Sequence, residues 1–157
     1  MTRRVVVVGI VVALGLGVFA IPAGAATSNP CQVLKQGEIF SALDGTVSSP
    51  QKGLATAVSK TCTWDVAASA TRPEGTVSVH VTTVGGQAAY DGLKKQTAQF
   101  VAVPELGKSL YQKTTGALSV LQGGKYLTVQ GVFIATSGHT DVEPQLIELM
   151  KIARKRV

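Results

Sequence analysis

The segment Ser137–Asp141 places the three side chains of a hydrolytic triad within five residues: Ser137, His139 and Asp141. A serine nucleophile, a histidine base and an acid catalyse acyl transfer only when the histidine lies between the other two, and the groups usually come from separate segments. We therefore interpret the segment as a polar loop, in which Gly138 makes a turn and Asp141 caps the next helix. A small secreted hydrolase that uses His139 is the alternative.

Three further groups have suitable side chains but lack the spacing that their chemistry requires. His80 and His139 lie far apart, with no cysteine or carboxylate at metal-ligand spacing near either. Residues 123–125 (Gly-Gly-Lys) resemble a phosphate loop only in part, because the remaining spacing and the following helix are missing. Glu143 and Glu148 lie at the start and on the exposed side of a predicted helix, where they do not pair for acid–base work. We therefore predict no catalytic residue, no metal site and no cofactor.

Positive charge gathers at the end of the chain. The protein has 15 lysines and arginines against 9 acidic residues. Basic residues at a helix C-terminus complement the helix dipole and keep the chain end soluble. They could also contact anionic envelope material, such as phospholipid head groups or cell-wall polymer. No aromatic residue is interleaved with them, so we expect no nucleic-acid partner. The cluster consists of Lys151, Arg154, Lys155 and Arg156.

The hydrophobic pattern predicts the elements that position these residues. Their order is helix, two strands, helix, three strands, helix, which indicates an α+β domain. We expect one antiparallel sheet of about five strands with helices packed on one face. Val132–Ala135 is apolar at every position, which predicts a strand end covered on both faces. The expected helices are 30–43, 87–100 and the segment after Asp141, and the expected strands are 58–66, 77–82, 109–113, 117–121 and 126–135.

Alternation in the first two strands predicts a polar face. Val58, Cys62, Trp64 and Val66 alternate with polar residues, so the apolar set should point into the core. The opposite face is free for a partner in a sheet that carries helices on one side only. We identify Thr63, Asp65, Ser78 and His80 as its candidate binding residues.

The N-terminus has the pattern of a secretory signal peptide. Val5–Ile21 are 17 residues without a charge; Arg3 and Arg4 precede them, and Ala23-Gly24-Ala25 follow. We predict a signal peptide over residues 1–25 and a single exported domain over residues 26–157. The alternatives are an uncleaved anchor, because 17 apolar residues are barely enough to span a bilayer, and twin-arginine export.

The protein contains two cysteines, Cys31 and Cys62. An oxidising destination makes one disulfide the expectation, and two cysteines allow only one pairing. The alternative is a reactive thiol pair or one catalytic cysteine with a histidine, but the apolar setting of Cys62 beside Trp64 raises the pKa of a thiol instead of activating it. Ser28-Asn29-Pro30 before Cys31 are not the small apolar residues that lipidation requires, so no acyl anchor is expected.

Four short motifs are spread along the chain: Cys31 at the start of a helix that ends in residues 41–45 (Ser-Ala-Leu-Asp-Gly), Cys62-Thr63-Trp64, residues 103–107 (Val-Pro-Glu-Leu-Gly) and the hairpin of residues 118–120 with 127–129. Together they resemble small exported actinobacterial domains, many of which are lipoproteins without an assigned biochemical function. The resemblance covers nearly all of residues 26–157. It implies a fold, an envelope or secreted location and a Cys31–Cys62 disulfide, but no catalytic residues. The chain departs from the lipidated members because it lacks a lipobox.

These observations predict a secreted or envelope-associated domain that binds a ligand without chemistry of its own. Its partner would be a protein or an envelope component, and we expect a monomer. A carrier of a hydrophobic envelope molecule is the alternative. Such a carrier would hold its cargo between Val132–Ala135 and the helices.

Overall fold

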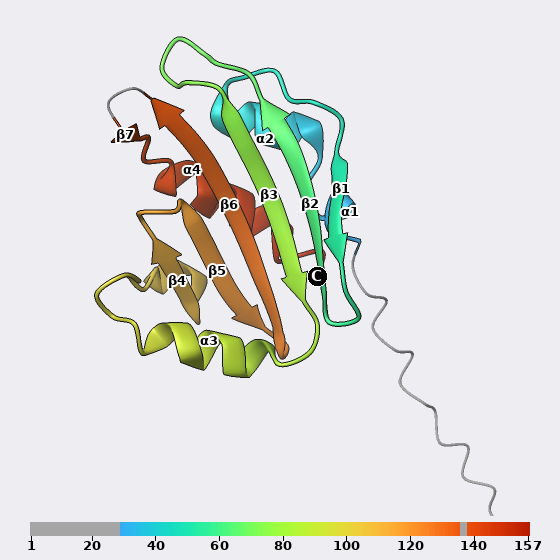
Figure 1. Cartoon of the computed structure of the whole chain (residues 1–157), viewed down its shortest axis with the longest axis vertical. Coiled ribbons are helices and arrows are strands. Elements are labelled where there is room, and N and C mark those ends of the chain that lie inside the picture. The colour runs from blue at the N-terminus through green and yellow to red at the C-terminus, as the bar shows by residue number, and fades with distance from the viewer. Residues whose placement is uncertain (1–28, 136–137) are drawn as a thin grey trace, which may run out of the picture.

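A computed structural model of the chain describes residues 29–135 and 138–157 (Figure 1). The predicted signal peptide, with its cleavage after Ala25, lies outside the described residues. Within the described part, no helix is long and apolar enough to cross a membrane.

One antiparallel sheet forms the centre of the molecule, and the α+β class is confirmed. Its strands lie in the order β1-β2-β3-β6-β5-β4, and the short β7 pairs with the end of β6. Side chains alternate between the two faces of such a sheet, and the inward positions are valine, leucine, tryptophan and phenylalanine. The strands are β1 (Gln51–Ala55), β2 (Ser59–Val66), β3 (Gly75–Thr82), β4 (Ser109–Gln112), β5 (Ala117–Gln122), β6 (Lys125–Ala135) and β7 (Gly138–His139).

Three helices and the inward face of the sheet enclose the main core. They are α1 (Pro30–Val33), α2 (Gln36–Leu43) and α4 (Glu143–Ala153), and they lie behind the sheet in Figure 1. The predicted stripe of α4 is confirmed, because Leu146, Leu149, Met150 and Ala153 are fully buried.

The single helix predicted over residues 30–43 is instead two helices. Leu34 has extended backbone angles, and its side chain turns into the core. The Glu38 carboxylate accepts a hydrogen bond from the backbone N–H of Lys35 at 2.8 Å, which starts the second helix. Burying Leu34 therefore takes precedence over a continuous helix.

The helix α3 (Gly86–Lys94) departs from the expected arrangement because it lies on the other face of the sheet. Its Tyr90 packs with Leu110 and Tyr126, whose strand neighbours Tyr111 and Leu127 point into the main core. Alternation therefore places α3 opposite α4, across one end of the sheet (Figure 1). It ends at Lys94, before the expected residue 100, and the one-turn 3₁₀ helix η1 (Pro104–Leu106) follows.

Three details of the strands differ from the sequence pattern. β1 was not predicted, because all five of its residues are exposed and show no alternation. Val58 precedes β2 and is 44% exposed, so it does not belong to the inward set. Val132–Ala135 is not covered on both faces: Phe133 is fully buried, but Ile134 is 70% exposed.

The predicted disulfide joins Cys31 to Cys62. It connects α1 to the inward face of β2, beside the fully buried Trp64. Disulfides persist in oxidising compartments, so the bridge indicates an oxidising, extracytoplasmic environment for this chain.

Candidate functional site

The four predicted binding residues lie on the outward face of the sheet, on two adjacent strands. Thr63 pairs directly with Ser78, and His80 and Asp65 occupy the neighbouring rows on either side. The row continues across β6, where Gln130 pairs with Ser78. Because α3 covers only one end of this face, the β2–β3–β6 part carries exposed and half-buried polar side chains. We call this part of the sheet the open face.

His80 is held by hydroxyl groups of its own sheet. Its Nδ1 lies 2.9 Å from Thr61 Oγ1, and its Nε2 lies 3.1 Å from Thr82 Oγ1. Partial burial lowers the pKa of His80 below its ordinary value, since the charged form loses hydration. Both ring nitrogens are thus engaged, and a structural role accounts for them.

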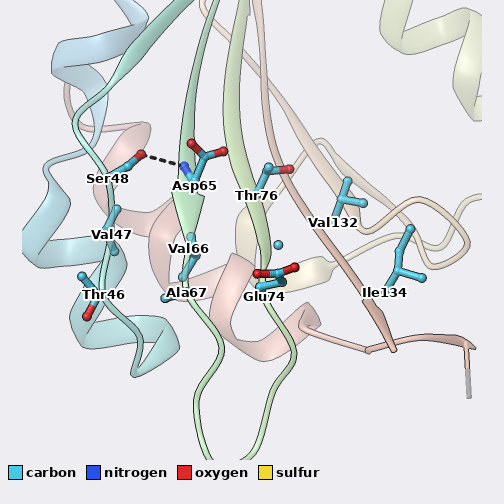
Figure 2. A pocket seen from close by; sticks show the side chains of 11 residues that line it. Thr46, Val47, Ser48, Asp65, Val66, Ala67, Glu74, Thr76, Val132 and Ile134 are labelled. Carbon is cyan, nitrogen blue, oxygen red and sulfur yellow. Dashed lines mark hydrogen bonds between the residues drawn. The ribbon is translucent and has the colours of Figure 1, made fainter. Parts of the chain in front are cut away.

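A groove of about 700 Å³ lies across the end of the open face where β2 and β6 finish (Figure 2). One wall is the segment 46–48, which runs beside the end of β2. There the Ser48 hydroxyl accepts a hydrogen bond from the N–H of Asp65 at 2.9 Å. Across the groove stand Val132 and Ile134 of β6. The lining residues are Thr46, Val47, Ser48, Asp65, Val66, Ala67, Glu74, Gly75, Thr76, Val132 and Ile134.

The groove combines apolar side chains with negative charge. Asp65 accepts a hydrogen bond from the Gln51 amide at 3.0 Å, and neither it nor Glu74 has an ion-pair partner among the described residues. No lysine or arginine belongs to the lining. The groove therefore favours a ligand that has an apolar group and a positive charge.

Arg72, in the loop between β2 and β3, makes its contacts on the inward side of the sheet. Arg72 is buried, and its guanidinium lies 4.3 Å from the ring centroid of the inward-facing Phe133. It donates two hydrogen bonds to the Leu43 carbonyl, at 3.1 and 3.3 Å, and one to the Ala67 carbonyl at 3.2 Å. Burial lowers the pKa of Arg72, but a guanidinium stays charged. Arg72 supports the groove from beneath and leaves its carboxylates uncompensated.

Val132 and Ile134 form a ridge between two hollows. On the far side of this ridge, a second hollow of about 400 Å³ is lined also by Thr114, Thr115 and Gln130. The space expected to hold a hydrophobic cargo, between β6 and the helices, is filled at Gly131. A Cβ atom there would meet Phe133, Val142 and Leu146 at 3.1–3.3 Å. The accessible apolar side chains of β6 therefore face away from α1, α2 and α4.

Intramolecular contacts engage much of the C-terminal basic cluster. Arg156 forms an ion pair with Glu38 at 2.6 Å and also donates to the Val33 carbonyl at 2.9 Å. Lys151 forms ion pairs with Glu105 at 3.3 Å and Glu148 at 2.8 Å. Arg154 donates to a backbone carbonyl, and Lys155 is exposed. The cluster thus fixes the end of α4 to its surroundings, and its contact with anionic envelope material stays a prediction.

The Ser137–Asp141 segment is only partly described. Ser137 and the side chain of His139 lie outside the described residues. Asp141 accepts hydrogen bonds from the Tyr111 hydroxyl at 3.0 Å and from the backbone N–H of Glu143 at 3.1 Å, and it pairs with Lys113. The second of these bonds reaches the first residue of α4, but the N-cap of this helix is Val142 and not the predicted Asp141. Burial, followed by the hydrogen bond with Asp141, raises the pKa of Tyr111. In the part of the chain that the structure describes, no group of three or more histidine, cysteine or acidic side chains could hold a metal ion.

Comparisons with protein-family models, curated proteins and solved structures found no match for this chain.

Sequence reasoning identified the open face but not the groove. The sequence did contain the information needed to place Val132 and Ile134. They are an even number of residues from the polar Thr128 and Gln130 on the same strand. Strict alternation along β6 therefore places all four on one face. The position of Glu74 beside β6 needed the three-dimensional pairing of β3 with β6.

Proposed function

We propose that this protein is a secreted or envelope-associated binding domain with no catalytic chemistry. It takes its ligand in the groove over β2, β3 and β6, and the ligand is a molecule with an apolar group and a positive charge. One observation carries the proposal: Val132 and Ile134 are accessible beside Asp65 and Glu74, with no compensating cation in the lining. The Cys31–Cys62 disulfide supports the extracytoplasmic location.

A pair of matched probes tests this proposal. Octylammonium and octanoate share an alkyl chain and differ in the sign of their charge, so calorimetric titration of each separates the apolar contribution from the electrostatic one. We expect binding of octylammonium, with octanoate at least several-fold weaker. Equal affinity for the two probes would remove the electrostatic part of the proposal, and no affinity for either would remove the groove.

A pair of matched variants tests whether octylammonium binds in the groove. Ile134→Ser removes apolar surface from the groove, whereas Val101→Ser makes a comparable change at an exposed residue beside β4. Both residues are largely exposed in the free protein, so neither change should alter stability by more than about 0.5 kcal/mol. Octylammonium should bind more weakly to the Ile134→Ser variant and unchanged to the Val101→Ser variant.

A carrier of a hydrophobic envelope molecule is the second candidate. The exposure of Ile134 and the two hollows that it shares with Val132 favour this function. The cargo would then lie on the open face, outside the core. Native mass spectrometry of the protein purified from its own envelope supports this candidate if a lipid of defined mass stays bound, and if Ile134→Ser releases that lipid.

A further inference from the structure

Charge is segregated along the strands. The acidic residues Asp44, Asp65, Glu74, Asp141 and Glu143 lie towards the end of the sheet where the groove is found, at the end of α2, the end of β2, the start of β3 and the start of α4. At the opposite end lie Lys60, Lys108 and Lys125, at the start of β2, just before β4 and at the start of β6, and Lys94 and Lys95 lie at the C-terminal end of α3. Lys52 of β1 precedes the turn into β2. The separation is partial, because Arg72 and Lys113 lie at the groove end and Asp91 lies on α3. Figure 1 shows both ends of the sheet.

The basic end also presents an apolar hairpin tip. Residues 53–58 (Gly-Leu-Ala-Thr-Ala-Val) comprise the end of β1 and the turn into β2; all six are exposed and none is charged. Leu54 is 86% exposed. Val84, 63% exposed, lies close to this segment, because the neighbouring Thr83 N–H donates to the Val58 carbonyl at 2.8 Å. We define residues 53–58 and Val84 as the hairpin tip.

Lysines flank the hairpin tip. Lys52 and Lys60 flank it in the sequence. Lys125, at the start of β6, lies beside Tyr126, the strand partner of Thr82, on the side towards Val84. Within the described residues, no ion pair engages Lys52 or Lys125. Exposed apolar residues with lysines around them are suited to the boundary of an anionic bilayer, where the aliphatic groups enter the acyl region and the ammonium groups meet phosphates.

We infer that the hairpin tip docks this protein on anionic lipid bilayers. The composition of the tip favours a bilayer over a protein partner. The energetic centres of protein interfaces are enriched in tryptophan, tyrosine and arginine, none of which occurs in residues 53–58 or at position 84. The positive charge of this end complements a negative lipid surface. Docking by the tip is independent of the proposed groove ligand and leaves the acidic end directed away from the bilayer.

Tryptophan fluorescence in the full chain tests the inference directly. The only native tryptophan, Trp64, is buried in the core, so it supplies a constant background. Leu54→Trp places a reporter in the tip, and Val101→Trp places one at an exposed position beside β4. With vesicles of phosphatidylcholine and phosphatidylglycerol, the emission of the Leu54→Trp variant should shift to shorter wavelength, while that of the Val101→Trp variant should not shift.

The matched reporters separate docking by the tip from attachment through another segment. Both variants carry the same N-terminal residues, so attachment by those residues alone would leave both reporters in water and would overturn the inference. An equal shift in the two variants, or an equal shift with vesicles of phosphatidylcholine alone, would also overturn it. The shift should disappear in molar salt, because screening removes the attraction of the lysines.

Variants that remove one charge measure how much each lysine contributes to vesicle binding. Lys52→Gln should lower the vesicle partition coefficient of the Leu54→Trp protein about five-fold, as expected for one lysine near an anionic surface. Lys155→Gln, an exposed lysine of the C-terminal cluster, is the matched control and should change partitioning less. Ile134→Ser should leave partitioning unchanged. If Ile134→Ser abolishes it, the tip is not the docking surface, and the groove is.

Discussion

The groove end and the hairpin-tip end of the same sheet are opposite in charge and similar in exposed apolar surface. At the groove, Val132 and Ile134 stand beside two carboxylates. At the tip, Leu54 and Val58 stand between two lysines. The net charge of +6 does not show this difference, because it is a sum over the whole chain. The length of the antiparallel sheet separates the two ends, so the two proposed binding surfaces do not overlap.

The largest expected effect tests whether the two ends depend on one core. Replacing Cys31 and Cys62 together by alanine removes a cross-link over 31 residues, which should lower the free energy of unfolding by about 3–4 kcal/mol. Chemical denaturation of the oxidised parent and the double variant measures this loss. Both binding activities should weaken together at temperatures where the variant begins to unfold. Survival of either activity above the unfolding midpoint would show that the ends are not parts of one cooperative unit.

Substitution of Arg72 should affect the groove end of the sheet and not the hairpin tip. Arg72→Leu removes the donors to Leu43 and Ala67 and leaves buried carbonyls without partners, so the free energy of unfolding should fall by about 2–3 kcal/mol. Lys52→Gln at the tip is the control and should change stability by less than about 0.5 kcal/mol. Octylammonium binding should weaken in the Arg72→Leu variant while vesicle binding is retained at temperatures where the protein stays folded. Loss of vesicle binding alone would contradict this division.

Removing the negative charge of the groove should have a smaller effect, on ligand affinity alone. In the variant Asp65→Asn with Glu74→Gln, both carboxylates are replaced by amides of similar size. Exposed charge pairs contribute up to about 1 kcal/mol each, so octylammonium affinity should fall about five- to ten-fold and octanoate affinity should rise. Calorimetric titration measures both. An unchanged preference between the probes would show that the carboxylates do not select the ligand.

The smallest effect concerns the ion pair that joins the end of the chain to α2. The side-chain hydrogen bond with Arg156 is the main cause of the lowered pKa of Glu38. A lowered pKa in the folded state means that the contribution is complete above the ordinary glutamate value and is lost as the pH falls through the lowered one. Glu38→Gln should remove that part of the acid dependence, at most about 1 kcal/mol because the pair is partly exposed. Thermal unfolding from neutral to acid pH checks it, with Glu148→Gln as the control.

Local patterns predicted most of the fold because burial imposes them. Alternation in β2 and β3 identified the open face, and the stripe Leu146–Ala153 identified the last helix. β1 escaped prediction because an exposed edge strand has no buried side and hence no period. The face of the sheet on which α3 packs could not be predicted from the local sequence either, because the apolar stripe around Tyr90 fits both faces.

The candidate sites depended on relations between distant segments. The C-terminal cluster looked like the basic surface of the chain, but Glu38 and Glu105 approach its arginine and lysine from other elements. The groove required β6 to bring Ile134 close to Glu74 and to the segment 46–48. The sequence therefore shows which residues are charged, but the three-dimensional structure is needed to show which charges lie close enough to compensate one another.

Backbone amide NMR during titration with octylammonium shows where the probe binds and so tests the location and charge preference of the groove. Chemical-shift changes should concentrate at Asp65, Thr76 and Val132, with little change in residues 53–58. Octanoate at the same concentration should leave the chemical shifts of those groove amides unchanged. Shifts that concentrate elsewhere with octylammonium, or identical groove shifts with both probes, would contradict the account.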